Sequence, residues 1–191
     1  SILKWLSRIK GSPLDFDDLN SRATELEPGC NGLIIQDHFQ GNRTPYTDPL
    51  SRGAITGLTL AHETHHLFRA IIEGIGFGTR AILDSFETAG YQSSEITIGG
   101  GAAASQLWLQ IHADTSGLPV RVPESRDAPS TGCAVLGACG AGYFDDIDMG
   151  INAMIRPGIS IDPIPQNVSR YAEIYPRYKA LYPALKQALN I

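Results

Sequence analysis

Hydrophobic side chains along the chain follow mostly helical spacing, interrupted by three short runs typical of strands. In the longest helical stretch, Leu67, Ile71 and Ile75 keep one apolar side. Helices are predicted over residues 1–10, 12–27, 62–89, 105–117, 130–142, 145–154 and 168–191. Strands are predicted over residues 32–35, 95–98 and 119–122. Strands that alternate with helices indicate an α/β layered domain.

Prolines and small polar residues mark the expected loops. Residues 39–53 contain Pro45 and Pro49 among polar side chains and are predicted to be a turn-rich loop. A second loop is expected after Arg156, and breaks are expected at Pro176 and Pro183 in the last helix. The chain opens within a helical pattern, so we expect further sequence upstream of residue 1.

Length and composition indicate one globular domain over residues 1–191. Hydrophobic residues make up 42% of the 191 residues and charged residues 18%, which argues against disorder. A net charge of −5 offers no basic surface for nucleic acid, and no apolar run reaches the length of a membrane span. Cys133 and Cys139 lie in an Ala/Gly-rich stretch and are interpreted as small core residues, in agreement with a reducing, cytoplasmic location.

His62, Glu63 and His66 spell the HExxH motif of zinc hydrolases, in which two histidines one turn apart hold the metal. A catalytic zinc needs a third ligand, but Arg69 and Ile72 occupy the positions at which a metzincin has its glycine and its third histidine. A zinc metallohydrolase therefore remains only an alternative, and no metal ligand is assigned. We interpret residues 62–65 as the exposed first turn of an amphipathic helix.

A glycine triplet, Gly99–Gly101, connects the strand predicted at 95–98 to the helix that follows. Glycines let a ligand approach the backbone, and amides at a helix N-terminus suit phosphate or a polar base. The triplet starts a GxGxxA pattern, and Glu124 after the next strand could bind a ribose. A nucleotide site and a tight packing turn both remain open at this point. The small residues of 130–142 indicate a helix that packs closely against a neighbour.

Four segments in order resemble the C-terminal domain of the FGGY carbohydrate kinases. They are the loop at 41–49, the signature Gly53-x-Ile55-x-Gly57-Leu58 continuing to His66-Leu67 and Ala70–Glu73, the glycine-containing segment 98–114 and the Gly/Ala-rich segment 124–142. In this signature residues 62–65 belong to an unspecified spacer, so the histidines need no metal. The resemblance also implies that the glycine triplet holds the adenosine of ATP rather than NAD.

The resemblance implies an actin-like ATPase, ribonuclease H-like fold with a mixed sheet flanked by helices. It further implies an ATP-dependent kinase, with Mg²⁺, that phosphorylates a small sugar or polyol, a ketopentose above all. In this family the catalytic base and the phosphate loops lie upstream of the region matched here. The chain is therefore expected to be a partial C-terminal domain, truncated at its N-terminal side, with no catalytic residue and no kinase activity alone.

Site residues follow from the same resemblance. Gly100, Gly101 and Ala102 are expected to face the nucleotide through their backbone, Ser105 to lie near the adenine and Lys4 to line the same pocket. Residues 41–48 are either a rim of the sugar cleft or a purely structural loop. The carboxylates of the chain are expected to be turn, cap or surface groups, namely Asp37, Asp48, Asp84 and Asp114.

Two further expectations concern function and assembly. A non-catalytic nucleotide-binding module is the remaining alternative function. A homodimer is expected to form through the apolar surface of a domain interface that the truncation exposes.

Overall fold

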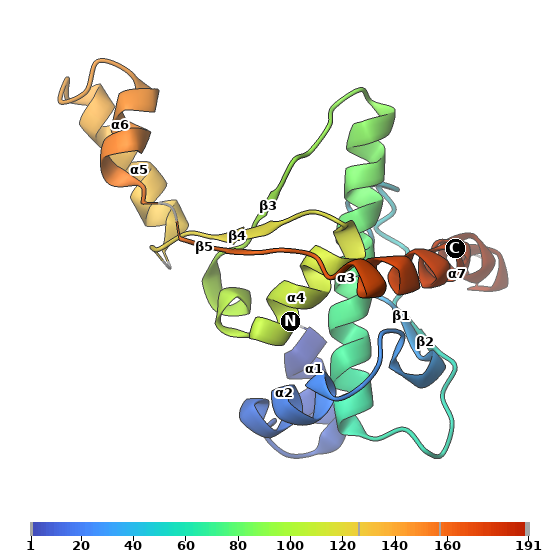
Figure 1. The fold of residues 1–191 in the computed structure, drawn as a ribbon. Coiled ribbons are helices and arrows are strands. Elements are labelled where there is room, and N and C mark those ends of the chain that lie inside the picture. Colours follow the sequence, from blue (N-terminus) through green and yellow to red (C-terminus); the bar gives the residue numbers. More distant parts are fainter. Residues whose placement is uncertain (1, 126, 157, 190–191) are drawn as a thin grey trace.

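The computed structural model describes residues 2–125, 127–156 and 158–189 (Figure 1). The helices are α1 (Ile2–Lys10), α2 (Phe16–Thr24), α3 (Thr64–Thr88), α4 (Gln106–Ser116), α5 (Ala128–Gly140), α6 (Ile147–Met154) and α7 (Pro165–Leu189). The strands are β1 (Ile34–Gln36), β2 (Ala54–Thr56), β3 (Ile96–Thr97), β4 (Val120–Val122) and β5 (Ile159–Ile161). Two 3₁₀ turns, η1 (Cys30–Gly32) and η2 (Gly100–Ala104), precede β1 and α4.

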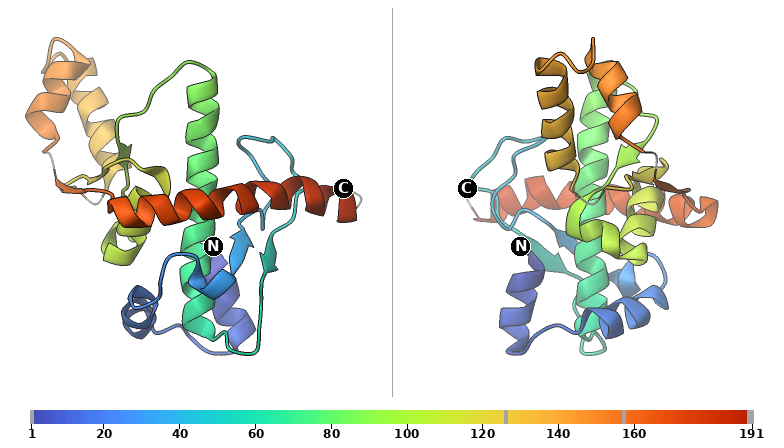
Figure 2. Two further views of the ribbon diagram at one scale, coloured as in Figure 1. Left: turned by 45° about the vertical axis from the view of Figure 1, so that its right-hand side comes forward. Right: turned by 90° about the vertical axis from the view of Figure 1, so that its left-hand side faces the viewer.

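The long helix α3 is the central element, and α7 runs across it (Figure 2). One small sheet pairs β1 with β2 in antiparallel register. The other has the order β3-β4-β5 and is mixed, because β3 and β4 are parallel whereas β4 and β5 are antiparallel. The predicted α/β class and the mixed sheet flanked by helices are confirmed.

Two strands were not predicted. β2 (Ala-Ile-Thr) and β5 (Ile-Ser-Ile) are short segments beside the predicted loops at 39–53 and after Arg156, and neither was separated from its loop. β5 follows the loop expected after Arg156, and it forms because Ile159 and Ile161 pair with Val122 and Val120 of β4.

The predicted breaks in the last helix are wrong. α7 runs from Pro165 to Leu189 with Pro176 and Pro183 inside it. Both prolines are exposed, so water can take the carbonyl groups that lose their helical partners. Tyr171, Ile174 and Tyr178 on the opposite side are buried and hold the helix against the core.

The core surrounds α3 on several sides. Leu6, Leu19, Phe68, Ile71 and Ile111 belong to a cluster that joins α1, α2, α3 and α4. A second cluster packs α7 onto β1 and the middle of α3, and a third joins α4 to β4. In the part of the chain covered by the structure, no helix combines the length and apolar character needed to cross a membrane.

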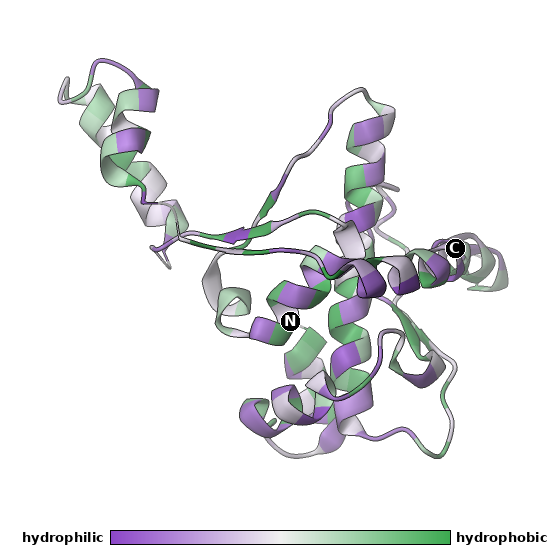
Figure 3. Ribbon diagram, viewed as in Figure 1, coloured by the Kyte–Doolittle hydropathy of each residue, from purple (hydrophilic) through white to green (hydrophobic). Residues whose placement is uncertain are grey.

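α5 and α6 stand apart from this core and pack against each other (Figure 1). Gly150 of α6 permits the close approach, because a Cβ there would lie 3.0 Å from Val135 and 3.1 Å from Sγ of Cys139. α5 packs against α6, but the prediction that the small residues of 130–142 allow this contact is wrong for its glycines, because a Cβ on Gly132, Gly137 or Gly140 would meet no atom within 4 Å. Figure 3 shows apolar residues on both helices, and Leu136 and Ile147 are 58% and 50% exposed. Cys133 is also exposed, so its assignment to the core was wrong.

Three glycines of α3 allow close contact with its neighbours. A Cβ on Gly74 would collide with the backbone carbonyl of Ile35 in β1, and one on Gly76 would lie 2.6 Å from Oγ1 of Thr115 in α4. A Cβ on Gly78 would lie 2.9 Å from Oδ2 of Asp37. The glycines lower helix propensity, yet they are required for the packing of this helix.

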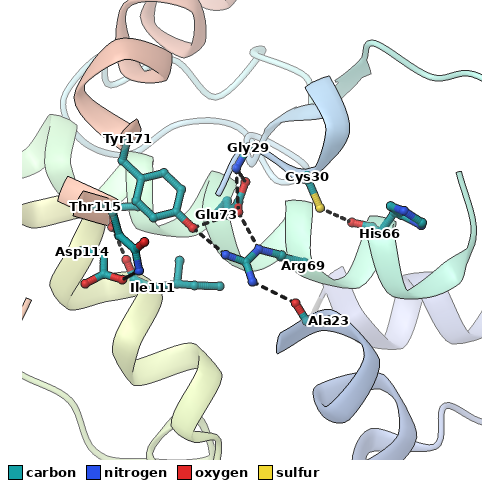
Figure 4. Close-up of polar contacts among 11 residues, drawn as sticks. Ala23, Gly29, Cys30, His66, Arg69, Glu73, Ile111, Asp114, Thr115 and Tyr171 are labelled. Carbon is teal, nitrogen blue, oxygen red and sulfur yellow. Dashed lines mark hydrogen bonds and ion pairs between the residues drawn. The ribbon is translucent and has the colours of Figure 1, made fainter. Parts of the chain in front are cut away.

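A buried ion pair joins α3 to three other segments (Figure 4). Nε of Arg69 lies 2.8 Å from Oε1 of Glu73, and both side chains are almost fully buried. Arg69 also donates to the Ala23 carbonyl at the end of α2 and to the Tyr171 hydroxyl of α7. Glu73 accepts from that hydroxyl at 2.9 Å and from the amide of Gly29. Burial alone would lower the pKa of Arg69, but Tyr171 and Glu73 raise it, so the guanidinium is charged.

Removing Arg69 leaves the Glu73 carboxylate buried without its cation. We expect Arg69→Met to lower the free energy of unfolding by about 3–5 kcal/mol, measured by urea titration. The control is Arg170→Met, because the Arg170–Glu173 pair is more than half exposed and its loss should change stability by less than about 0.5 kcal/mol. Equal effects of the two substitutions would contradict a dominant role for the buried pair.

Candidate nucleotide site and the tyrosine row of α7

Four tyrosines on one side of α7 each donate a hydrogen bond to a carboxylate. We call Tyr171, Tyr175, Tyr178 and Tyr182 the tyrosine row. Their hydroxyls lie 2.9, 2.7, 2.8 and 2.8 Å from carboxylate oxygens of Glu73, Asp84, Asp37 and Asp48, in that order. Glu73 and Asp84 belong to α3, whereas Asp37 and Asp48 follow β1. The row therefore fixes α7 to α3 and to the loop after β1.

The prediction that the aspartates are simple turn, cap or surface groups is wrong, because all four accept a hydrogen bond from a side chain of α7. They are Asp37, Asp48, Asp84 and Asp114. Asp114 is 2% exposed and accepts hydrogen bonds from Gln110, from the amide of Ile164 and from Asn167. It therefore joins α4 to the start of α7. Asp48 is 8% exposed, and the ammonium of Lys186 and the Tyr182 hydroxyl lower its pKa to about 2.

The loop between β1 and β2 is held by its own side chains. Asn42 and Asp48 exchange two backbone hydrogen bonds of 2.8 and 2.7 Å. The imidazole of His38 contacts Ser51 and Asn42, each at 2.8 Å. The Tyr46 ring stacks on Tyr182 of α7 with 4.0 Å between centroids. The turn-rich loop predicted at 39–53 is confirmed, and α7 helps to order it.

The glycine triplet forms an open turn between β3 and α4. Gly100 has a φ of +71°, and a Cβ on Gly100 or Gly101 would meet no atom within 4 Å. A cavity of about 500 Å³ lies against this turn. It is lined by Gly100, Gly101, Ala103, Ala104, Val122, Pro123, Glu124, Gly158 and Ile159. Bare backbone therefore faces a cavity large enough for part of a nucleotide.

The structure brings together only some of the predicted nucleotide residues. Gly100 and Gly101 line the cavity, and Ala102 lies in the same 3₁₀ turn without lining it. Ser105 caps α4 by accepting from the amide of Trp108 and donates to Asn20 of α2 at 2.6 Å. Lys4 is exposed on α1 and does not line the cavity. These assignments stay predictions.

Gly158 is a residue of this cavity that the sequence did not reveal. A Cβ there would collide with the backbone carbonyl of Val122 at the end of β4. The requirement for glycine comes from the approach of β5 to β4, and no motif around residue 158 indicates that approach.

The residues of the HExxH motif have structural partners. Glu63 and His66 form a capping box at the start of α3, in which Nδ1 of His66 accepts from the Glu63 amide at 3.1 Å. The Glu63 carboxylate also contacts Arg22 of α2 at 2.6 Å, and His62 accepts from the Thr59 amide at 2.9 Å. Within residues 2–125, 127–156 and 158–189, no three His, Cys, Asp or Glu side chains are grouped so that they could hold a metal.

The predicted exposure of this first turn is wrong in part. His65 and His66 are 7% and 8% exposed, because α2 and the turn before β1 pack beside them: Arg22 contacts Glu63, and Asn31 contacts His66 at 3.3 Å. Burial lowers the pKa of both histidines from the usual 6.5. The unfolded chain therefore binds more protons than the folded one just below that pH.

The free energy of unfolding should accordingly decrease as the pH falls below about 6.5. Above that pH the contribution of the two neutral imidazoles should be complete. We expect a lower urea midpoint at pH 5.5 than at pH 7.5. His65→Leu should reduce this difference, because leucine fills the buried site and cannot bind a proton. A midpoint that is unchanged or higher at pH 5.5 would contradict the assignment of neutral, buried imidazoles.

Comparison with known proteins supports the resemblance seen in the sequence. The pattern of the FGGY family of carbohydrate kinases, C-terminal domain, matches residues 1–141. The xylulose kinase of Staphylococcus epidermidis is 31% identical over 97% of this chain and 37% of its own length. The ribulokinase of Bacillus licheniformis is 31% identical over 92% of this chain and 33% of its own length.

The fold agrees with solved kinases. The crystal structure of xylulose kinase from Rhodospirillum rubrum superimposes with a TM-score of 0.83 and 27% identity, covering 99% of this chain and 38% of that protein. The chain thus spans little more than a third of the length of these relatives. The superposition covers 99% of the chain, and the family's C-terminal domain pattern covers residues 1–141. The chain belongs to the FGGY family of carbohydrate kinases.

Proposed function

We propose that this chain is the adenosine-binding part of an ATP-dependent carbohydrate kinase that phosphorylates a ketopentose. The observation that carries the proposal is the open glycine turn beside a cavity of about 500 Å³ in a chain of this family. The names of the relatives, xylulose kinase and ribulokinase, favour a ketopentose as the substrate.

The geometry of the turn suits a nucleotide. Gly100 and Gly101 leave backbone amides and carbonyls accessible, so a flat base can lie against them. The N-terminus of α4 follows immediately and carries a partial positive charge that favours the anionic side of the ligand. Glu124 also lines this cavity, and a carboxylate there can accept hydrogen bonds from ribose hydroxyls.

The remaining predicted residues have supporting roles in this proposal. Ser105 fixes the end of the turn through its cap and its bond to Asn20. Ala102 belongs to the same 3₁₀ turn, and Lys4 on α1 is assigned to the nucleotide by the family resemblance. Of the five residues predicted to bind the nucleotide, Lys4 has an exposed side chain on α1.

Phosphoryl transfer depends on positioning and on neutralisation of charge at the phosphates. We assign the catalytic base and the phosphate loops to the part of the kinase outside residues 1–191. Mg²⁺ held with the phosphates of ATP would supply the neutralising charge, and no residue of this chain is assigned to it. The protein is proposed to act in the cytoplasm, and the exposed apolar residues of α5 and α6 offer a surface through which the isolated chain can form homodimers.

Gly101 provides a direct test of the nucleotide site. Its φ is not in the left-handed region and a Cβ there meets nothing, so Gly101→Val should fold normally. The added side chain projects where the ligand would lie, and we expect ADP affinity to fall at least about tenfold in calorimetric titration.

Gly137→Val is the matched control, because Gly137 of α5 also has open space around it and lies outside the cavity. Its affinity for ADP should equal that of the unchanged chain. Equal affinity of the Gly101→Val variant would contradict the site.

The isolated chain should bind ADP without catalysing transfer. We expect no formation of ADP from ATP above background when D-xylulose or D-ribulose is added to residues 1–191, measured by a coupled assay. Sugar-dependent turnover by this chain would show that it contains the catalytic base and would overturn the division of roles.

A further inference from the structure

His38 follows β1 and has polar partners at both of its ring nitrogens. Nδ1 lies 2.8 Å from Oγ of Ser51 and 3.1 Å from Nε2 of Gln36. Nε2 lies 2.8 Å from Nδ2 of Asn42. The residue is 3% exposed, so water cannot easily replace these partners. One imidazole thus joins the end of β1 to both sides of the loop that connects β1 with β2.

Two of these partners are side-chain amides whose orientation is fixed by other contacts. Asn42 accepts from the Tyr46 backbone amide through Oδ1 at 2.9 Å, so its amide nitrogen faces the imidazole. Gln36 donates through Nε2 to the Arg52 carbonyl at 3.1 Å, so it also turns a donor toward the ring. The imidazole of His38 therefore lies between two donors, each of which needs a lone pair.

Only a neutral imidazole has a lone pair to offer. Nε2 of neutral His38 can accept from Asn42 while the N–H group at Nδ1 donates to Ser51. The Gln36 amide then faces an N–H group, and its own Oε1 is buried without a hydrogen-bond partner in the described part of the chain. An imidazolium carries an N–H group on both nitrogens and would oppose Asn42 as well. Protonation therefore turns one unfavourable contact into two.

The charges near His38 act in opposite directions. Burial disfavours an imidazolium, whereas the carboxylates of Asp37 and Asp48 favour it. Burial prevails and lowers the pKa of His38 from the usual 6.5. The rings of Tyr46 and Tyr182 pack edge-on against the imidazole, with 6.0 and 5.7 Å between centroids, and add to this burial.

The two carboxylates respond differently to acid. Asp48 accepts from the ammonium of Lys186 at 2.9 Å, and its pKa of about 2 keeps it charged in weak acid. Burial raises the pKa of Asp37, although the Tyr178 hydroxyl donates to its Oδ1 at 2.8 Å. A proton on Asp37 would remove a charge that favours the imidazolium, and would lower the pKa of His38 further.

The contact between His38 and Asn42 is continuous with contacts that hold α7. The Tyr46 amide donates to Asn42, and the Tyr46 ring stacks on Tyr182 with 4.0 Å between centroids. Asn42 also exchanges two backbone hydrogen bonds with Asp48, whose carboxylate accepts from Tyr182. An Asn42 side chain that turned its oxygen toward an imidazolium would leave the Tyr46 amide without its acceptor.

We propose that His38 is a pH-sensitive switch of the loop between β1 and β2. The neutral ring holds the loop closed on the C-terminal half of α7, and a proton on the ring releases Asn42 and the stack of Tyr46 on Tyr182. The switch uses groups of this chain alone, so it does not rest on nucleotide binding or on the proposed kinase function.

The sign of the pH dependence follows from the lowered pKa. In an open loop the imidazole meets water and regains a pKa near 6.5. The contribution of the neutral ring to loop closure is therefore complete above about pH 6.5 and decreases as the pH falls below it. Between 6.5 and the pKa of the closed loop, each pH unit should favour opening about tenfold.

A titration of ¹⁵N-labelled protein from pH 7.5 downwards tests the switch. The imidazole nitrogens of His38 should report a midpoint below pH 6.5. The backbone amides of Tyr46 and Asp48 should shift with the same midpoint, and the nuclear Overhauser contacts between the rings of Tyr46 and Tyr182 should disappear with it. Val120, buried in β4, should keep its signal, which distinguishes local opening from unfolding of the domain.

Asn42→Asp should reverse the response. Aspartate keeps an oxygen for the Tyr46 amide and replaces the donor that faces Nε2 of His38 with a charged acceptor. An imidazolium then fits the closed loop, so His38 should titrate above pH 6.5. The stack of Tyr46 on Tyr182 should persist at pH 5.0.

Asn31→Asp is the matched control, because Nδ2 of Asn31 contacts Nε2 of His66 at 3.3 Å. It places the same charge beside another buried histidine, and the midpoint of His38 should stay that of the unchanged chain. Equal effects of the two substitutions on this midpoint would overturn the proposal.

The unchanged chain decides the question even if Asn42→Asp does not fold. A His38 midpoint at or above pH 6.5 would overturn the proposal, as would protonation of His38 while the amides of Tyr46 and Asp48 stay in place. The same holds if His38 remains neutral until the Val120 signal reports unfolding of the whole domain.

Discussion

The buried pair of Arg69 and Glu73 is the interaction on which the arrangement of this domain depends. Two charges removed from water are tolerated only when the remaining donors and acceptors are satisfied. Here the partners come from the end of α2, the turn before β1, and α7. The hydrogen bonds that complete this one ion pair therefore fix the positions of three segments around α3. One of them is α7, about a hundred residues away in the sequence.

α7 makes further hydrogen bonds to carboxylates along its length. Tyr171, Tyr175 and Tyr178 each combine an apolar ring, which packs on the core, with a hydroxyl that reaches a carboxylate. The ring of Tyr182 stacks on Tyr46 instead, and its hydroxyl reaches Asp48. The spacing of residues 171, 175, 178 and 182 keeps them on one side of the helix, so its two prolines can face water. Through Asp37 and Asp48 the row also holds the loop after β1.

The sequence predicted much of this structure, but not its polar contacts. The helical spacing of apolar residues predicted α3 and α4. The glycine triplet was correctly placed between β3 and α4, because the motif and the elements on either side of it are adjacent in the sequence. Asp114 and Asp48 were misjudged because their partners, Asn167 and Tyr182, are far away in the sequence. His65 looked exposed because its neighbours are polar, whereas burial depends on the packing of α2. Gly158 lines the glycine cavity only because β5 approaches β4.

The central claim is that exposed backbone at Gly100 and Gly101 binds the adenosine of ATP. A crystal structure of residues 1–191 with ADP tests it most directly. We expect the base against the glycine turn and the ribose near Glu124, inside the cavity that Gly158 also lines. ADP bound at another surface, or an empty turn at saturating ADP, would contradict the account.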